Sequence, residues 1–559
     1  MSRNNVLIVG AGPTGLVLAN WLARLGIPLR IIDKAAEPGT TSRALAVHAR
    51  TLELYRQLDL TDSVIDNGHK VPAVNLWVKG KPEARVSFAD IASDLTPYPF
   101  IKMFPQDEHE KLLIQRLQAF GISVERPIEL IGFTDAGDRV IAQLRGPKGD
   151  ETYEAAYIAG CDGARSAVRK ATGTGFPGGT YNQVFYVADA TASGPSVNGE
   201  VNIDLDEADF LAVFPLKGEG RVRLIGTVRD ERARRAESLT FADVSGQAIE
   251  HLKIQIKQVN WFSTYQVHHR VTDHFRKGRA LLLGDAAHIH SPAGGQGMNT
   301  GIGDSINLAW KLAAVLKEEA PEELLDSYEA ERIAFARKLV KTTDQIFSMA
   351  TAEGKIAELI RTRLAPLVIP TVTKVGAARE WLFRTVSQLM INYRDSELST
   401  GKAGEIHGGD RLPWVKAADN YGPLSQPTWQ VHVYGSASTE LTQWCAARQL
   451  PLHVFEWQDA HATVGFACNA LYLLRPDTYV ALAEASGSPE AIEVYFKDRG
   501  WERLADSSIT RPLAARLHDP LTRTEGSCAD WGTAHSTAPP GGTAHSPRWR
   551  LPKRRCPVP

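Results

Sequence analysis

The stretch Val6-Leu7-Ile8-Val9-Gly10-Ala11-Gly12-Pro13-Thr14-Gly15 decides the fold of this chain. Its first four residues form an apolar run typical of a buried strand, and a glycine-rich turn follows directly. The residues from Leu16 to Leu25 predict a helix that stops at Gly26, and Leu29–Asp33 predict a second strand. This order of strand, turn, helix and strand is that of a βαβ unit with parallel strands.

The glycine spacing in this turn points to a bound dinucleotide. Gly10 permits the sharp turn, Gly12 lets the backbone approach a pyrophosphate, and Gly15 lets the helix pack closely on the strand. The helix N-terminus adds amide donors and a partial positive charge. Asp33 is placed to accept hydrogen bonds from a ribose diol. The alternative is a purely structural glycine turn.

Two later stretches carry related features. Gly284-Asp285 follows an apolar run, and the glycine-rich residues 292–301 lead into a helix expected over Ile302–Leu316, so this region predicts a second site for a polyol phosphate. In Gly160–Arg169, Asp162 lies at a tight turn with two arginines; taken alone, it fits an ordinary turn with a capping aspartate.

Composition and charge exclude several classes of protein. The 559 residues are 43% hydrophobic, which predicts roughly two to four domains. The formal net charge of -1 gives no global attraction to nucleic acid or to an anionic membrane. No apolar run reaches the roughly 18 residues of a membrane span, and the opening residues lack the pattern of a signal peptide. Five widely spaced cysteines predict neither a disulfide framework nor a zinc ribbon, so a cytoplasmic location is expected.

Together these elements resemble the flavoprotein aromatic hydroxylases, the single-component FAD monooxygenases of the para-hydroxybenzoate hydroxylase and phenol hydroxylase type. The dinucleotide fingerprint, the Asp162-Gly163 pair and the Gly284-Asp285 pair match the family's three motifs in order. The resemblance runs from about residue 4 to 505. Flanking matches are Ser42-Arg43-Ala44, Arg50-Thr51-Leu52-Glu53, Gln106, Tyr328-Glu329-Ala330-Glu331-Arg332 and Leu473-Leu474-Arg475-Pro476-Asp477.

The resemblance implies an α/β fold in which a Rossmann-like FAD-binding domain carries an inserted antiparallel β-rich substrate domain and a C-terminal thioredoxin-like domain. The apolar and polar alternation between about 180 and 270 independently favours an antiparallel sheet. The expected ranges are 1–75, 100–180 and 270–350 for the FAD-binding domain, 75–100 and 180–270 for the substrate domain, 350–400 for a helical connector, 401–505 for a thioredoxin-like domain without redox cysteines, and 510–559 for a disordered tail.

The resemblance also assigns cofactor roles. Gly10, Gly12 and Gly15 would hold the FAD pyrophosphate and Asp33 the adenosine ribose, and Asp285, beside Gly284, would bind the ribityl chain or the pyrophosphate. Arg43, Arg50 and Gln106 would lie along the ribityl and phosphate side of the flavin. The loop with Pro292, Gly295, Gly297, Met298 and Asn299 would place amides near the isoalloxazine edge, and Asp162, Gly163 and Arg165 would serve both FAD and NAD(P)H.

The activity implied is NAD(P)H-dependent and O₂-dependent hydroxylation of a phenolic or polycyclic aromatic substrate through a flavin C4a-hydroperoxide. Candidates for contacting the phenol are His48, Tyr181, Tyr186 and Arg223; the alternative for each is a plain core or surface role. His288 and His290 are interpreted as structural, and no metal is expected. A homodimer is possible. Alternatives are action on a non-phenolic compound such as an antibiotic, double-bond reduction, or a non-catalytic FAD-binding interaction protein.

Overall fold

The computed structural model describes residues 5–39, 44–78, 80–88, 93–205, 210–228, 239–244, 246–291, 293–351 and 376–501, all within one compact unit over residues 1–513. The predictions for Arg43, for Pro292 and for the tail at 510–559 fall outside these residues. Within the described ranges, every helix is too short or too polar to cross a membrane.

A five-stranded sheet forms the base of the part of the chain where the FAD-binding domain is expected, which is called the FAD-binding region below. Its order is β17 (Arg276–Lys277), β18 (Ala280–Leu282), β11 (Tyr157–Gly160), β1 (Val6–Val9) and β2 (Leu29–Ile32), and the last four strands are parallel. Helix α1 (Pro13–Arg24) connects β1 to β2, so the predicted βαβ unit is confirmed. The helix begins at Pro13 rather than Leu16 because proline, which lacks an N–H, fits the first helical position.

Further elements surround this sheet. Helix α5 (Gln106–Ala119) packs on α1, where Asn20 Nδ2 donates to the Leu113 carbonyl over 3.0 Å. A separate antiparallel sheet of β8 (Glu129–Asp135), β9 (Val140–Gly146) and β10 (Gly149–Ala155) leads into β11, and α6 (Ala167–Thr172) follows β11. The three short strands β3 (Ala46–Val47), β4 (His69–Val71) and β7 (Ile101–Met103) form another sheet, and α2 (Ala49–Tyr55), η1 (Arg56–Leu58) and α3 (Thr61–Asn67) follow β3.

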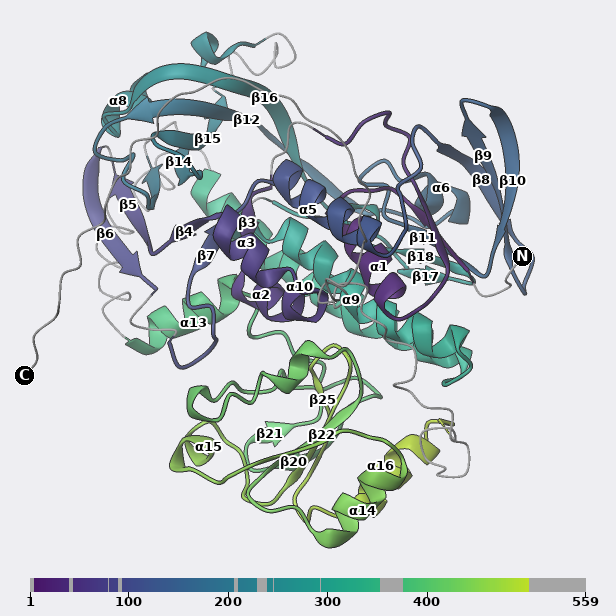
Figure 1. Cartoon of the computed structure of the whole chain (residues 1–559). Helices are drawn as coiled ribbons and strands as arrows, with labels where there is room; N and C mark the ends of the chain where they lie inside the picture. The colour runs from purple at the N-terminus through teal and green to yellow at the C-terminus, as the bar shows by residue number, and fades with distance from the viewer. Residues whose placement is uncertain are drawn as a thin grey trace, which may run out of the picture. The chain divides into compact units, whose positions relative to one another are not determined.

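An eight-stranded sheet forms the region where the substrate domain was expected. Its order is β19 (His288–Ile289), β16 (Gln255–Val271), β12 (Gly178–Ser193), β15 (Arg221–Val228), β14 (Phe210–Pro215), β13 (Val201–Leu205), β5 (Ala73–Val78) and β6 (Lys81–Ser87). Figure 1 shows the long strands β12 and β16 running side by side. The sheet is mainly antiparallel, as predicted, but β13 pairs with β5 in parallel, which the long stretch of chain between the two strands allows.

The two faces of this sheet pack against different partners. One face is covered by η3 (Phe241–Asp243) and α8 (Gly246–His251), and its core includes Val184, Tyr186 and Leu224. A second apolar cluster joins Val201 and Phe214 to β3 and to α13 (Gly376–Val386). The sheet therefore separates an outer core from a layer that borders the FAD-binding region.

Two long helices complete the FAD-binding region. Helix α9 (Gly297–Leu316) packs against α1, and η6 (Glu322–Leu325) precedes α10 (Asp326–Thr351). The four residues Glu322–Leu325 form a 3₁₀ turn after Pro321, and the α-helix starts at Asp326. Short 3₁₀ turns at helix starts are common because they satisfy end groups locally.

The C-terminal domain is a six-stranded mixed sheet, green to yellow in Figure 1. Its order is β21 (Ile406–His407), β20 (Thr400–Ala403), β25 (Val480–Glu484), β24 (Leu471–Leu474), β22 (Gln430–Tyr434) and β23 (Leu452–Phe455), with helices α14 (Thr439–Ala447), α15 (Asp459–Thr463) and α16 (Pro489–Lys497). The thioredoxin-like assignment stays a prediction. The three cysteines of the described residues are unbridged, and burial raises the pKa of Cys445 to about 11, which disfavours its reactive thiolate.

Candidate functional site

The glycine turn after β1 has two glycines that tolerate no side chain and one that faces open space. A Cβ on Gly10, which has φ +102°, would lie 2.4 Å from the Cys161 carbonyl oxygen. A Cβ on Gly15 would lie 2.0 Å from the Gly10 carbonyl oxygen. A Cβ on Gly12 would meet nothing within 4 Å. Gly10 and Gly15 are therefore required by packing, whereas Gly12 leaves room beside the N-terminus of α1 that a ligand can use.

The predicted ribose ligand lies next to this turn. Asp33 Oδ2 accepts a hydrogen bond from the Ala11 amide over 2.8 Å, and Oδ1 accepts from the Ala35 amide over 2.8 Å. Arg126 NH1 lies 3.2 Å from Oδ1. These bonds hold the carboxylate at the edge of the glycine turn, and Oδ2, which has one donor, keeps a second lone pair for another.

The second glycine-rich region packs directly onto the first. A Cβ on Gly284 would lie 2.7 Å from Thr14 Oγ1, and a Cβ on Gly301 would lie 2.3 Å from the same atom. Ser305 Oγ donates to the Thr14 carbonyl over 2.7 Å. Thr14, on the first turn of α1, thus fits into a notch made by Gly284 and Gly301, which lie far along the chain. The exposed Asp285 follows directly after Gly284.

The Asp162 turn supports both interpretations of its motif. Asp162 Oδ2 accepts from the Ala167 amide over 2.6 Å and from the Val168 amide over 3.2 Å, as an ordinary helix cap does. Its Oδ1 is buried and accepts no hydrogen bond from the described residues. Arg165 is exposed, whereas Arg169 is buried and donates to the Ala286 carbonyl over 2.6 Å. Arg169 therefore connects this turn to the 3₁₀ turn Gly284–Ala286, called the Gly284 loop below.

His48 and Asn299 join β3 to residues 293–299, which comprise the loop before α9 and the first residues of α9 and are called the loop at 293–299 below. Asn299 Oδ1 accepts from the His48 amide over 3.0 Å and from Thr51 Oγ1 over 2.7 Å, and Asn299 Nδ2 donates to the Ala46 carbonyl over 2.8 Å. His48 Nε2 lies 2.9 Å from the Gly294 carbonyl oxygen and 3.2 Å from the Gly295 carbonyl oxygen. Because both partners are acceptors, Nε2 carries the proton, which leaves Nδ1 as an acceptor.

Two histidines beside this loop, the buried His48 and the partly buried His290, are neutral at pH 7. His48 is 0% exposed, and burial lowers its pKa to about 4; burial also lowers the pKa of His290 to about 4. His290 Nδ1 donates to the Ser291 carbonyl over 2.7 Å. His48 Nδ1 and His290 Nε2 are buried without a hydrogen-bond partner in the described parts of the chain. Each ring therefore holds one fixed tautomer and one bare acceptor nitrogen.

These histidines predict a pH dependence of stability. Between about pH 6.5 and 4 the unfolded chain binds protons that the folded chain does not, so the free energy of unfolding falls as the pH drops through this window. His48→Gln retains an N–H for the Gly294 carbonyl and is expected to remove up to about 3 kcal/mol of this loss. Urea unfolding of the wild-type and variant apoproteins at pH 7, 6, 5 and 4 gives the free energy of unfolding at each pH. If this free energy falls equally steeply with pH in both proteins, the prediction is wrong.

Arg50 and Gln106 lie near the site but are engaged with protein groups. Gln106, at the start of α5, donates from Nε2 to Glu110 Oε1 over 2.8 Å. Arg50 is 3% exposed, and its NH2 donates to the Asp477 carbonyl over 3.1 Å and to Thr478 Oγ1 over 2.9 Å. The described contacts of Arg50 thus join α2 to the C-terminal domain, and its role along the flavin stays a prediction.

The four candidates for contacting a phenol do not form one cluster. Arg223 is 1% exposed and makes a bidentate pair with Asp189, with distances of 2.6 and 2.8 Å, while its NH1 lies 3.5 Å from the Ala44 carbonyl oxygen next to β3. Tyr186 pairs with Gly226 on the opposite face of the sheet, within the outer core. One pocket therefore cannot take both Arg223 and Tyr186.

Tyr181 lies at the end of the sheet that faces α10. Its hydroxyl donates to Asp344 Oδ1, and its ring packs edge-on against His269 with ring centroids 4.9 Å apart. Of the four candidates, His48 and Arg223 therefore border the layer between the sheet and the FAD-binding region, at opposite ends of the segment 44–48.

Three residues to which the sequence assigned no role organise this site. Thr14 fills the notch between the two glycine-rich regions, Asp304 accepts from the Gly284 amide over 3.0 Å, and Arg332 Nε donates to Asp304 Oδ1 over 2.7 Å. Asp304 is the one carboxylate in the largely apolar helix α9. Because a buried acid needs hydrogen-bond or charged partners, this position could have been recognised in the sequence as structurally important. His288 Nε2 also bonds Asp304 Oδ2 over 2.7 Å, in keeping with its structural interpretation. The described residues contain no cluster of potential metal ligands.

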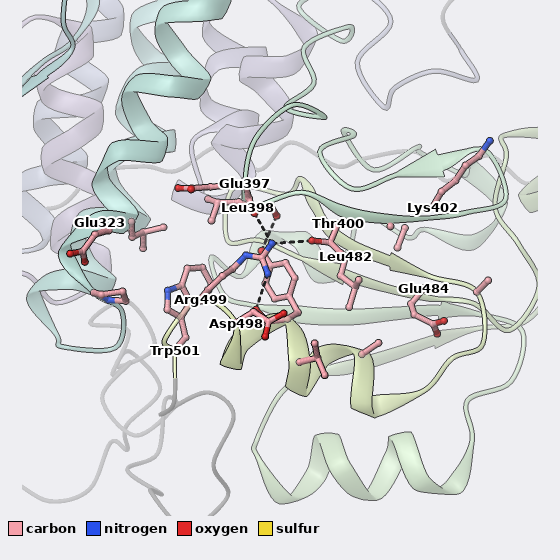
Figure 2. Close-up of a pocket in the computed structure, with 18 residues that line it drawn as sticks. Glu323, Glu397, Leu398, Thr400, Lys402, Leu482, Glu484, Asp498, Arg499 and Trp501 are labelled. Carbon is pink, nitrogen blue, oxygen red and sulfur yellow. Dashed lines mark hydrogen bonds between the residues drawn. The ribbon is translucent and has the colours of Figure 1, made fainter.

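A large pocket lies elsewhere in the fold. Its volume is about 940 Å³, and Figure 2 shows it between Glu323, near the start of α10, and the C-terminal domain at Thr400, Leu482 and Arg499. Arg499 NH2 donates to Thr400 Oγ1 over 2.9 Å at its wall. None of the predicted cofactor or catalytic residues lines this pocket, so we do not place the substrate there.

The site fits a flavin dinucleotide. The open space at Gly12 lies at a helix N-terminus whose cap residue has no side chain to bond the first-turn amides, which suits a pyrophosphate. Asp33 borders the same turn, and the bare acceptors of Asp162, His48 and His290 border the two loops that pack against it. The donors and acceptors needed by an extended polar ligand are therefore present.

Comparisons with known proteins agree with this geometry. Residues 3–343 match the model of the FAD binding domain family. The chain is 32% identical over 517 residues to 6-methylpretetramide 4-monooxygenase of Streptomyces rimosus (85% of this chain, 90% of the relative) and 29% identical over 423 residues to pentachlorophenol 4-monooxygenase of Sphingobium chlorophenolicum (74% and 76%).

Solved structures give the same result for the fold. The anhydrotetracycline hydroxylase of Streptomyces rimosus superposes with a TM-score of 0.72 at 28% identity, and the match covers 88% of this chain and 98% of that one. The family model spans more than half of the chain, and the first relative is matched over nine tenths of its length. The chain therefore belongs to the FAD binding domain family of flavoprotein monooxygenases.

Proposed function

We propose that the protein is an NAD(P)H-dependent FAD monooxygenase that inserts one oxygen atom of O₂ into a phenolic or polycyclic aromatic compound. In the balanced reaction, substrate, NAD(P)H, a proton and O₂ give hydroxylated product, NAD(P)⁺ and water. FAD, when bound, supplies the redox chemistry by accepting electrons from NAD(P)H and delivering them to O₂. The observation that carries the proposal is the junction of the two glycine-rich regions around Thr14, beside the open space at Gly12.

The cofactor residues would act mainly through the backbone. Gly10, Gly12 and Gly15 would cradle the pyrophosphate at the start of α1, and Asp33 would bind the adenosine ribose. Asp285 would bind the ribityl chain or the pyrophosphate, and the loop at 293–299 would face the isoalloxazine edge. Asn299 fixes this loop through its bonds to Ala46 and His48, so the amides of the loop are held in place before the cofactor binds.

The substrate would lie between the eight-stranded sheet and the FAD-binding region. The cluster there includes Phe88, Met103, Leu216 and Phe383, which offers an apolar wall to an aromatic ring and excludes water. Arg223, held by Asp189, would orient the ring through a polar substituent. Because His48 is neutral and its Nδ1 has no partner in the described residues, this nitrogen would accept a hydrogen bond from a phenolic hydroxyl.

The role of Arg223 is testable on the sheet itself. Arg223→Gln removes the guanidinium and is expected to raise the Michaelis constant for the aromatic substrate about tenfold and to raise the share of O₂ released as hydrogen peroxide. Arg221→Gln, on the same strand and exposed, is the matched control. Steady-state NAD(P)H oxidation with peroxide and product measured in parallel checks this. An unchanged Michaelis constant and coupling ratio for Arg223→Gln would remove Arg223 from the site.

The proposed reaction is tested with the purified, FAD-loaded protein and a panel of phenols and polycyclic aromatic compounds. Substrate-stimulated NAD(P)H oxidation with product heavier by one oxygen is the expected result. A gain of two hydrogens would support double-bond reduction, and a hydroxylated product from a non-phenolic compound would change the substrate class. Bound FAD without nicotinamide oxidation under any condition would favour a binding protein.

A further inference from the structure

The C-terminal domain inserts one buried turn, Arg475–Tyr479, into the FAD-binding region. Arg475 is 1% exposed and Asp477 is 2% exposed. Gln57 Nε2 donates to the Pro476 carbonyl over 2.6 Å, and Arg50 NH2 donates to Thr478 Oγ1 over 2.9 Å. Thr478 has φ +70°, a conformation that a β-branched residue rarely adopts and that persists only where its surroundings enforce it.

Arg475 connects this turn to α10. Its guanidinium makes a bidentate pair with Asp477, with distances of 2.9 and 2.6 Å, and a second bidentate pair with Glu331, with distances of 2.7 and 3.0 Å. Glu331 also accepts from Lys311 Nζ over 2.8 Å and from Asn307 Nδ2 over 2.7 Å, both on α9. One carboxylate of α10 therefore joins the C-terminal domain to α9.

Arg332, the next residue on α10, continues toward the cofactor loops. Its Nε donates to Asp304 Oδ1 over 2.7 Å, its NH1 to the Tyr393 hydroxyl over 2.9 Å and its NH2 to the Thr300 carbonyl over 3.1 Å. The ring of Tyr393 packs on Tyr479 with centroids 4.5 Å apart and lies 5.2 Å from the Arg475 guanidinium. Asp304 Oδ2 then accepts from the Gly284 amide.

A small cavity lies within this network. Its volume is about 20 Å³, enough for roughly one water molecule. Asn299 and Arg332 line it from the FAD-binding region, and Asp477 and Tyr479 line it from the C-terminal domain. The turn of the C-terminal domain therefore borders the same cavity as the residue that fixes the loop at 293–299.

We propose that the turn Arg475–Tyr479 positions the Gly284 loop and the start of α9 for FAD through Glu331, Arg332 and Asp304. In this account the C-terminal domain, whose described cysteines form no pair, serves the cofactor site by holding it in place. Buried ion pairs are poor sources of net stability because desolvation offsets their attraction, so a network of this size is better explained by the geometry that it fixes. The inference rests on the proposed FAD site, and its residues act as positioning residues.

Two pairs of variants test the proposal. Asp477→Asn removes a carboxylate that pairs with Arg475 inside the network, and Asp410→Asn removes one that makes a bidentate pair with Arg394 elsewhere in the C-terminal domain. Tyr393→Phe removes the hydroxyl bonded to Arg332, and Tyr472→Phe removes a buried hydroxyl that donates to Ala403 outside the network. The second member of each pair controls for loss of a similar interaction.

The readouts are the FAD dissociation constant of the full-length apoprotein, the absorption spectrum of the bound flavin and the urea midpoint of the apoprotein. Asp477→Asn and Tyr393→Phe are expected to weaken FAD binding about tenfold and to shift the flavin spectrum, while both controls stay within about twofold of wild type. If the network variants bind FAD like wild type and change only the urea midpoint, the network is merely structural and the proposal fails. If Gly12→Ala also leaves FAD binding unchanged, the proposed FAD site itself fails.

Discussion

Replacing Gly12 by alanine is expected to weaken FAD binding strongly while leaving the free energy of unfolding of the apoprotein nearly unchanged. A Cβ at this position meets no protein atom within 4 Å, and the backbone angles of φ -77° and ψ -177° suit alanine. The added methyl group would instead occupy space needed for the close approach of the pyrophosphate. We expect the FAD dissociation constant to rise by at least about 100-fold, which corresponds to roughly 2.7 kcal/mol.

The control for Gly12→Ala is Gly132→Ala. Gly132 also has open space at its Cβ position but lies in β8, in a sheet that carries no predicted site residue. Flavin fluorescence titration of the two apoproteins, with urea unfolding of both, separates binding from stability. A Gly12→Ala protein that binds FAD as tightly as the Gly132→Ala protein would show that the dinucleotide lies elsewhere.

Removing the Glu331 carboxylate is expected to cause the largest loss of stability. Glu331→Ala leaves Lys311 without its carboxylate partner and Arg475 with only Asp477, and such uncompensated buried charge costs about 3–5 kcal/mol. Glu322→Ala, which removes a half-exposed partner of Arg276, should cost no more than about 1 kcal/mol. Urea unfolding of the apoproteins measures both losses. Equal losses for the two variants would show that the buried network contributes no more to the free energy of unfolding than an exposed ion pair does.

The same carboxylate predicts acid sensitivity. Although burial opposes ionisation, Arg475 and Lys311 hold the pKa of Glu331 well below its usual range. In the unfolded chain the pKa of a glutamate is about 4.3, and in the folded protein the pKa of Glu331 is lower. The ionised carboxylate therefore stabilises the fold above pH 4.3, and this stabilisation is lost as the pH falls toward the pKa of the folded protein. This window lies mostly below that of His48 and His290, so the stability of the wild type should go on falling as the pH drops below about 4.

The parts of the fold that depend on local sequence were predictable. The run Val6–Val9, the glycines after it and the strand ending before Asp33 define a βαβ unit because strand, turn and helix signals stand next to each other in the chain. The short apolar run at 210–214 and the mixed run at 221–225 likewise form the adjacent antiparallel strands β14 and β15. In both cases the pattern of buried residues within each segment contains the needed information.

The parts that depend on distant contacts were not predictable from one sequence. Arg50 stands in a family motif, yet its partners Asp477 and Thr478 lie more than 400 residues later. Tyr186 and Arg223 are both polar residues of the sheet, but strand register places them on opposite faces, and a shift of one residue would reverse that placement. Thr14 and Asp304 gain their roles only when the chain brings Gly284 against both.

The most direct test of the account is product analysis under isotopically labelled O₂ with the FAD-loaded protein, NAD(P)H and the panel of aromatic compounds. We predict a hydroxylated aromatic product that carries one labelled oxygen atom, formed in proportion to the NAD(P)H consumed. Nicotinamide oxidation that yields only hydrogen peroxide or a product heavier by two hydrogens with every compound, or no oxidation at all by protein that holds FAD, would contradict the assignment as an aromatic monooxygenase.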